Sequence, residues 1–178
     1  IIVEEATRLN DIITDFINFA RPRSPKLNPC RVDDVIEKTL TFLTAQIEER
    51  GYTIEKDYQN PLPEIMGDAP MLHQSFLNLF INAMQAMPDG GRIGVVLRAE
   101  GGLVRVEIED AGPGIPADLS DKIWDPFFTT KDKGTGLGLG IVKNIVEAHA
   151  GTIRIANREP QGARVIIDLP VRKPEGDA

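Results

Sequence analysis

The stretch GTGLGLG at residues 134–140 constrains the fold more than any other part of the chain. An apolar helical pattern follows it without a break. Glycine costs conformational entropy on folding and offers no side chain to pack, so four glycines in seven residues need a reason. Bare backbone N–H groups at a helix N-terminus suit an anion such as phosphate. The stretch therefore predicts an anion-binding turn, although it matches neither G-x-x-x-x-G-K-S/T nor G-x-G-x-x-G.

The composition excludes some broad classes of protein. The 178 residues suffice for one well-cored domain and a small appendage. A net charge of −7 and a pI of about 4.9 argue against a nucleic-acid-binding protein, which presents a basic face to phosphates. No apolar run approaches the roughly 18–20 residues that span a bilayer. The single cysteine, Cys30, cannot form an internal disulfide, and a reducing, cytoplasmic environment is the simplest interpretation.

The first 20 residues carry an apolar seam with the spacing 4-3-4-3-4, which is the heptad pattern of a bundle helix. Pro22 and Pro25 end this helix. We expect residues 1–25 to be one helix of a bundle in a longer protein, with its partner helices outside this chain. The seam consists of Ile2, Ala6, Leu9, Ile13, Phe16 and Ala20.

From residue 26 onward, helical and strand patterns predict an α+β fold, with one mixed sheet and helices on one face. Helices are expected at residues 32–51, 69–87 and 137–149. Strands are expected at residues 52–59, 92–100, 103–110, 151–157 and 163–170, with a hairpin turn at Gly101-Gly102. Residues 111–136 are irregular, with room for one short helix near residues 119–124. A connection of this length is typical of a functional loop or lid.

The helix predicted at 69–87 begins with Asp68 as a candidate N-cap and is apolar over most of its surface. A stripe of amides interrupts that surface at positions i, i+4, i+8 and i+11, namely Gln74, Asn78, Asn82 and Gln85. Burying these amides without partners would cost roughly 1–3 kcal/mol each. Either the stripe is a solvated face, or it lines a polar cavity for a ligand or metal. Amide oxygens suit Mg²⁺.

The sequence EIEDAGPGIP at residues 107–116 places Asp110 at the end of a predicted strand. Gly112 and Gly114 then allow the backbone to approach a flat ligand closely. A carboxylate at this position can accept a hydrogen bond from an exocyclic amine such as that of adenine. A plain turn aspartate is the alternative interpretation.

Together and in this order, the amide helix, EIEDAGPGIP, WDPFFTTK (124–131) and GTGLGLG resemble the N, first glycine, F and second glycine boxes of sensor histidine kinases. These kinases belong to the GHKL ATP-binding superfamily, and the resemblance implies a Bergerat-type sandwich with an ATP lid. Residues 1–25 resemble the second helix of the dimerisation and phosphotransfer domain, particularly of the nitrogen-regulation type. Residues 26–171 resemble the catalytic ATP-binding domain, which leaves residues 172–178 as a tail.

The resemblance implies a role for each matching residue. Asn78 and Asn82 would hold Mg²⁺ and the phosphates as the catalytic pair, and Asp110 would bind the adenine amine. Phe127 and Phe128 would hinge the ATP lid. The implied nucleotide-binding set also contains Gln85, Gly112, Gly114, Ile115, Thr130, Lys131, Gly134, Thr135, Gly136, Leu137, Gly138 and Leu139.

Two positions depart from the family pattern or extend it. The family often has Thr-Thr after the glycine of the last hairpin, where this chain has Ala163 and Arg164, so we expect no adenine contact there. Gly140 extends the second glycine box by one residue, and we interpret it as a packing feature.

A histidine kinase also needs an acceptor imidazole, and this chain contains only His73 and His149. We expect neither to be the acceptor, which would lie upstream of Ile1. The phosphoryl group would then pass to an aspartate of a cognate response regulator, and the full-length kinase would be a homodimer. The ATPases of the superfamily have an N-box glutamate that activates water, where this chain has Asn78. Without that general base, transfer to protein is favoured over hydrolysis.

Two other functions remain open at this point. One is a GHKL ATPase of the gyrase or chaperone type, which steady ATP hydrolysis would reveal. The other is a non-catalytic ATP-binding interaction module, in which the nucleotide only sets the lid.

Overall fold

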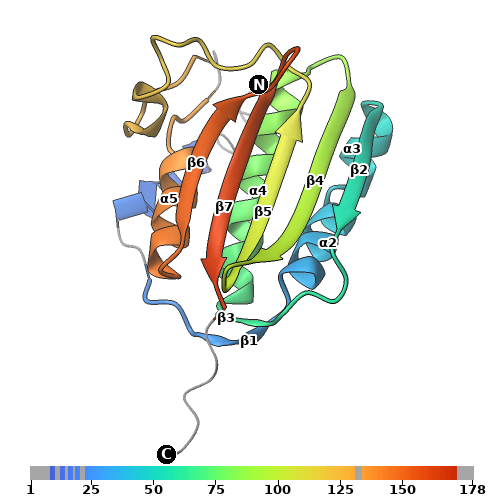
Figure 1. Cartoon of the computed structure of the whole chain (residues 1–178). Helices are drawn as coiled ribbons and strands as arrows, with labels where there is room; N and C mark the ends of the chain where they lie inside the picture. The colour runs from blue at the N-terminus through green and yellow to red at the C-terminus, as the bar shows by residue number, and fades with distance from the viewer. Residues whose placement is uncertain are drawn as a thin grey trace, which may run out of the picture.

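The predicted mixed sheet is confirmed in a computed structural model that describes residues 9–10, 13–14, 16–17, 19–20, 23–130 and 134–171. The strands are β2 (Tyr52–Tyr58), β4 (Gly91–Glu100), β5 (Leu103–Asp110), β6 (Thr152–Asn157) and β7 (Ala163–Pro170). Their order in the sheet is β2-β4-β5-β7-β6 (Figure 1). β2 runs parallel to β4, and the other neighbours are antiparallel.

Three helices cover one face of this sheet, namely α2 (Val32–Phe42), α4 (Ala69–Ala86) and α5 (Gly138–Ala148) (Figure 1). Alternate residues of each central strand point toward them, as the period of two requires. Ile93 and Val95 on β4 are fully buried, as are Phe76 and Phe80 on α4. Each buried phenylalanine contributes roughly 1.5–3 kcal/mol of apolar burial. The core therefore lies between α4 and the sheet.

The helix predicted at residues 32–51 is wrong in one respect, because it breaks at Leu43. α2 ends at Phe42, and a separate short helix, α3 (Thr44–Glu49), follows. Leu43 adopts φ −90° and ψ 0° and is buried in the core. None of the residues of α3 is buried. The break therefore keeps Leu43 in the core while the chain after it continues along the surface. The short helix predicted near residues 119–124 is a 3₁₀ turn, η1 (Lys122–Trp124).

The sequence patterns did not predict a small two-stranded sheet formed by β1 (Asn28–Cys30) and β3 (Ile65–Gly67). Strands of three residues are too short to show a period. Their pairing places the segment that leads into α2 beside the segment that leads into α4 (Figure 1).

Asp68 and His149 join three segments beside this small sheet. The Asp68 carboxylate accepts hydrogen bonds from Met71 N–H at 3.1 Å, which confirms the predicted N-cap, and from Lys26 N–H at 2.8 Å. His149 Nε2 accepts from Asp68 N–H at 2.9 Å, and its Nδ1 lies 2.7 Å from the Ile145 carbonyl. Burial raises the pKa of Asp68, but the two N–H donors and the nearby Arg23 outweigh this and lower it. The Lys26 bond supports the domain boundary at residues 25/26, which stays a prediction.

The N-terminal helix is described at residues 9, 10, 13, 14, 16, 17, 19 and 20, which are all helical. The seam residues Leu9, Ile13 and Phe16 are exposed there, whereas Phe19 packs against the core. The predictions for Ile2 and Ala6 and for the tail at 172–178 lie outside the described residues. Within the described parts of the chain, no helix has both the length and the apolar character that crossing a membrane requires.

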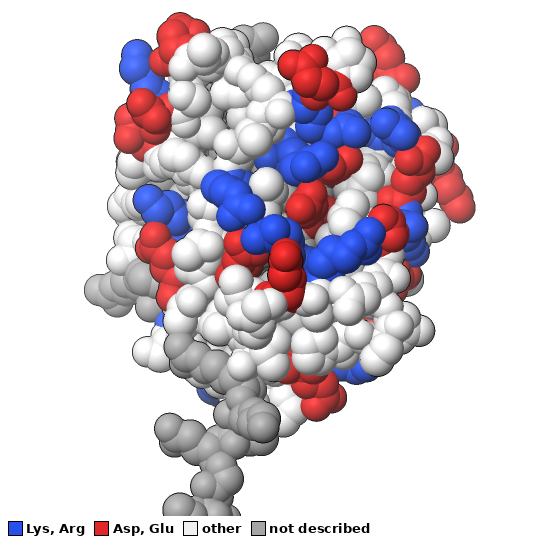
Figure 2. Space-filling view, viewed as in Figure 1, with Lys and Arg blue, Asp and Glu red and all other residues white. Residues whose placement is uncertain are grey.

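The outer face of the sheet carries interleaved basic and acidic side chains (Figure 2). Asp168 on β7 is only 6% exposed, and it accepts from Arg105 Nε at 2.7 Å and from Arg154 at 3.0 Å. Burial raises the pKa of Asp168, but the two guanidinium groups outweigh burial and lower it. More exposed pairs, such as Arg92–Glu55 at 3.0 Å, lie farther out on the same face.

We expect acid to weaken the fold through Asp168. The pKa of Asp168 is lower in the folded chain than in the unfolded chain. The ion pairs of Asp168 therefore make their full contribution to the stability of the fold when the pH is above the ordinary carboxyl pKa of about 4. That contribution disappears as the pH falls through the lowered folded-state pKa. Asp168→Asn should reduce the free energy of unfolding in urea by roughly 2 kcal/mol at neutral pH and flatten its acid dependence.

Glu55→Gln is the matched control, because the Arg92–Glu55 pair is exposed on both sides. Its effect should stay below roughly 0.5 kcal/mol. An Asp168→Asn chain with the same acid dependence as wild type would contradict this assignment.

Candidate functional site

The structure brings three separate segments of the sequence together at one end of the sheet. A Cβ atom placed on Gly138, at the start of α5, would lie 4.0 Å from the Asn82 amide nitrogen on α4. A Cβ placed on Gly112 would lie 3.0 Å from Ala86 at the end of α4. The amide stripe, the loop after β5 and the glycine run are therefore neighbours in space.

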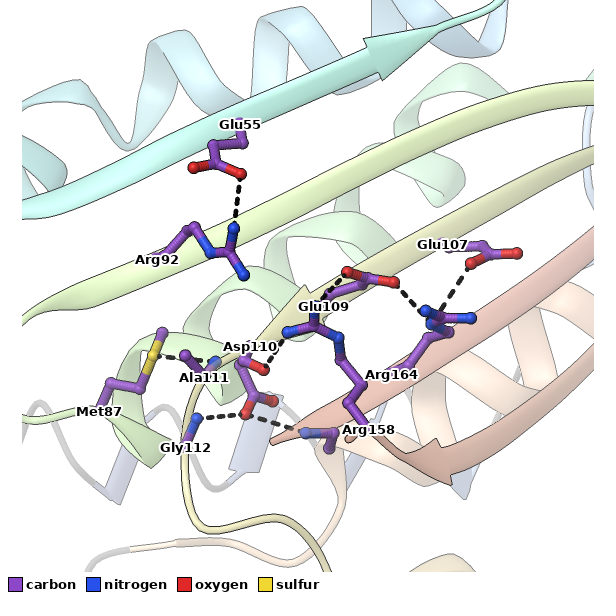
Figure 3. A network of polar contacts seen from close by, with 11 residues as sticks. Glu55, Met87, Arg92, Glu107, Glu109, Asp110, Ala111, Gly112, Arg158 and Arg164 are labelled. Carbon is purple, nitrogen blue, oxygen red and sulfur yellow. Dashed lines mark hydrogen bonds and ion pairs between the residues drawn. The ribbon is translucent and has the colours of Figure 1, made fainter. Parts of the chain in front are cut away.

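Asp110 ends β5 and is held in place through one of its two carboxylate oxygens. Oδ1 accepts from Gly112 N–H at 2.9 Å and from Ala163 N–H at 3.2 Å (Figure 3). Among the described residues, no hydrogen bond reaches Oδ2. Asp110 thus makes the bond of a turn aspartate and still offers an oxygen to a further donor. The structure confirms the turn interpretation, and binding of adenine by Asp110 stays a prediction.

The two glycines after Asp110 are required by protein packing as well as by any approach of a ligand. Gly114 has φ +78°, and its Cβ would lie 2.9 Å from Asn157 Oδ1. A Cβ on Gly112 would press on both the side chain and the carbonyl of Ala86. Packing is therefore a further reason for glycine at both positions, and the close approach of a flat ligand stays a prediction.

The F box and the second glycine box meet at a neck formed by Phe127 and Gly136. Phe127 N–H donates to the Gly136 carbonyl at 3.0 Å. Both residues have positive φ, +65° and +69°, and a Cβ on Gly136 would overlap the backbone of Phe127. The segment between them is thus a loop closed at its base. Thr130 on this loop is exposed, and Lys131 lies outside the described residues.

Helix α5 begins directly after this loop without a side-chain cap. Since the N-cap residue Leu137 has no side-chain oxygen to cap them, the N–H groups of its first turn suit an anion. Leu137 anchors the turn in the core, and its N–H points to Thr135 Oγ1 at 3.4 Å. A Cβ on Gly140 would lie 2.9 Å from the Phe19 ring, which supports the interpretation of Gly140 as a packing residue.

Exposure divides the predicted site residues. The amides Gln74, Asn78 and Asn82 are half-buried, and Gln85 is exposed. Other half-buried members are Asp110, Gly114, Ile115, Phe128, Gly134, Thr135, Gly136, Gly138 and Leu139. Gly112 and Leu137 are buried, and Phe127 and Thr130 are exposed.

These segments lie within a stretch that matches a known family. Residues 67–173 match the family model of histidine kinase-, DNA gyrase B-, and HSP90-like ATPases. The chain belongs to this family. The match begins next to Asp68 and extends beyond β7, so it contains every segment of the candidate site.

Similar proteins from this ATPase family are sensor kinases. The chain is 37% identical over 171 residues to the sensor histidine kinase ZraS of Escherichia coli strain K12, covering 96% of this chain and 37% of ZraS. Full-length ShkA in complex with AMPPNP has a TM-score of 0.86 at 27% identity over 96% of this chain and 37% of ShkA. ThkA in complex with the response regulator TrrA has a TM-score of 0.83 at 27% identity over 96% of this chain and 49% of ThkA.

The comparisons support the predicted GHKL superfamily and its sandwich fold, while the nitrogen-regulation type stays a prediction. The chain spans little more than a third of ZraS, so the activity of the whole protein belongs to the proposals below.

Both histidines of this ATPase domain make ring contacts within the protein. His149 is only 3% exposed, and both of its ring nitrogens have hydrogen-bonding partners. His73 Nδ1 lies 2.8 Å from Thr39 Oγ1, and its ring meets Phe42 edge-on. These contacts support the expectation that neither residue is the acceptor.

Sequence reasoning missed the contribution of the β6–β7 hairpin to the site. Ala163 carries no adenine-binding side chain, yet its backbone N–H holds Asp110 Oδ1. Asn157, Arg158 and Gln161 also bond to the segment that follows β5. No periodicity or motif marks these residues, because their partners lie over 40 positions away.

Gly136→Ala should open the neck of the loop, because an alanine there is strained at φ +69° and overlaps Phe127. We expect the Phe127 amide hydrogen to exchange with solvent at least roughly tenfold faster in this variant. Gly101→Ala is the control, since Gly101 also has positive φ, but has open space around it. Equal exchange at Phe127 in the two variants would contradict a closely packed neck.

Proposed function

We propose that this chain is the catalytic ATP-binding part of a sensor histidine kinase. It binds Mg-ATP and transfers the γ-phosphoryl group to a histidine upstream of residue 1. The proposal rests chiefly on one observation, the meeting of Asp110, the α4 amides and the start of α5 within a family-matched ATPase domain. Its similarity to ZraS favours a kinase within that family.

Asp110 would select the base. Its Oδ2 would accept a hydrogen bond from the exocyclic amine of adenine, while the backbone N–H groups of Gly112 and Ala163 donate to the other oxygen. When a nucleotide displaces water from this carboxylate, the oxygen needs a new hydrogen-bond donor. A base without the exocyclic amine does not supply one and therefore binds less well. The glycines at 112 and 114 keep this wall of the site free of side chains. The complex of the similar ShkA with AMPPNP supports an adenine nucleotide as ligand.

The phosphates would lie against the first turn of α5 and under the loop between Phe127 and Gly136. Uncapped N–H groups at the start of α5 donate to them. Asn78 and Asn82 would hold Mg²⁺, because they carry hard amide oxygens one helical turn apart on α4, and Asn82 lies beside the start of α5. There the ion would neutralise charge that develops on the phosphates during phosphoryl transfer.

Phosphoryl transfer is favoured over hydrolysis because α4 has amides where the ATPases of the superfamily have a glutamate. Water needs a general base, whereas a neutral imidazole is already nucleophilic and mainly needs positioning. We place the acceptor role on a histidine elsewhere in the full-length protein, and the burial and contacts of His149 support this. The second helix of its bundle would be residues 1–25.

Partners follow from this reaction. A phosphohistidine passes its phosphoryl group to an aspartate of a response regulator, and the complex of the similar ThkA with TrrA supports such a partner. The exposed seam residues Leu9, Ile13 and Phe16 would lie in the bundle of a homodimer. The chain would be the cytoplasmic part of its sensor.

Asp110→Asn should weaken binding of ADP and ATP by roughly 1.5–3 kcal/mol, because it removes a charged acceptor from the amine. Isothermal titration calorimetry of this chain with both nucleotides measures the effect. Asp34→Asn, an exposed aspartate on α2, makes the same charge change away from the site and should bind like wild type. Wild-type affinity in Asp110→Asn would remove Asp110 from the adenine site.

The reaction is tested with γ-labelled Mg-ATP, this chain and an acceptor polypeptide that contains the segment upstream of residue 1. Label should appear on the acceptor and not on this chain. Asn82→Ala should slow labelling at least roughly tenfold because the phosphates lose their positioning, while Asn28→Ala on β1 should not. Steady phosphate release without acceptor would favour the ATPase function. Binding with neither labelling nor hydrolysis would favour the interaction module.

A further inference from the structure

The segment after β5 has an unusual source of support, because side chains of the β6–β7 hairpin hold its backbone. The Asn157 amide makes two reciprocal bonds to one residue. Ile115 N–H donates to Asn157 Oδ1 at 2.7 Å, and Asn157 Nδ2 donates to the Ile115 carbonyl at 2.8 Å. A side-chain amide presents a donor and an acceptor side by side, so it pairs with a backbone as a neighbouring strand would.

The same hairpin holds the start of this segment. Arg158 donates to the Asp110 carbonyl at 3.2 Å, and Gln161 donates to the Ala111 carbonyl at 2.9 Å. Arg158 is itself fixed by Glu109, 3.1 Å away on β5 (Figure 3). With the Ala163 N–H bond to the Asp110 carboxylate, hairpin groups reach each end of the segment 110–115.

Two glycines show how tightly the hairpin and this segment fit. A Cβ on Gly162 would overlap the Asp110 carbonyl, and a Cβ on Gly114 would lie 2.9 Å from Asn157 Oδ1. The hairpin and this segment therefore approach backbone to backbone at Gly162, and the Asn157 side chain contacts the backbone at Gly114, so neither contact leaves room for a shift. A displacement of the hairpin moves Asp110 and its loop.

We propose that Asn157 is a positioning residue for base recognition at Asp110. This inference rests on the proposed function, since it takes Asp110 as the adenine acceptor. Asn157 fixes the far end of the segment at Ile115, while Arg158 and Ala163 fix the near end at Asp110. Gly112 donates to Asp110 Oδ1 from the middle of this segment, so its position sets the direction of the free Oδ2. Asn157 thus acts on the choice of base through the loop.

The test compares ADP with IDP, which carries a carbonyl in place of the adenine amine. Wild type should bind ADP at least roughly tenfold more tightly than IDP, because a site built for a donor rejects a ligand lacking it. In Asn157→Ala the ratio of the two dissociation constants should shrink by roughly threefold or more. Asn28→Ala is the matched control, because it also loses an amide-to-carbonyl bond, to Lys26, and it should keep the wild-type ratio.

The ratio separates positioning from a merely structural role. If Asn157→Ala only unfolds part of the protein, the fraction that can bind nucleotide falls, and both dissociation constants rise by the same factor. Their ratio then stays unchanged, and that result overturns the inference. Should Asn157→Ala fail to fold, Gln161→Ala replaces it in the test, because this variant loses only one exposed hydrogen bond, to the Ala111 carbonyl. It should also lower the ratio of the two dissociation constants, but by less. An unchanged ratio in that variant also overturns the inference. If wild type binds no ADP, or binds ADP and IDP alike, the proposed adenine site itself fails.

Discussion

The structure depends on the two faces of helix α4. A helix with one apolar side must bury it, and α4 buries Phe76 and Phe80 fully against the sheet. Because a helix has 3.6 residues per turn, the burial of these two phenylalanines fixes the direction of all the remaining side chains of α4. Asn78 and Asn82 share one side of α4, and Asn82 lies close to Gly138 at the start of α5. The placement of the amides therefore follows from the placement of the core.

Close backbone contact is the second constraint on the site. The neck of the loop requires glycine at 136, and the approach of the β6–β7 hairpin to β5 requires glycine at 162. In both places a Cβ would overlap the backbone of a distant residue, Phe127 or Asp110. These two glycines therefore shape the candidate site by letting backbone segments pack directly against each other.

Charged side chains on the outer face of the sheet hold the backbone at Asp110. Glu109 fixes Arg158, and Arg158 in turn holds the Asp110 carbonyl, so a half-buried ion pair contributes to the geometry around Asp110 (Figure 3). On the helical side, the Asp68–His149 contact joins the start of α4 to the end of α5 in the same way. Both arrangements place polar groups where secondary structure ends and backbone donors would otherwise lack partners.

Much of the chain was predictable from sequence because the deciding physics is local. Periodicity located α4, the β4–β5 hairpin and α5, and Asp68 marked the start of α4, since a cap bonds to a residue three positions on. The four boxes indicated the family, and the family match agrees. The break at Leu43 escaped prediction because burial of one residue decided it.

The sequence by itself determined the elements, their apolar faces and the residue types of the candidate site. Only the tertiary structure decided that Asn157 pairs with Ile115, that Ala163 N–H holds Asp110, and that Phe127 meets Gly136. Each of these contacts uses at least one backbone group, and the first two join segments over 40 positions apart. Every non-proline residue carries the same backbone donor and acceptor. Backbone groups leave no trace in composition or spacing, so their pairing appears only once the chain has folded.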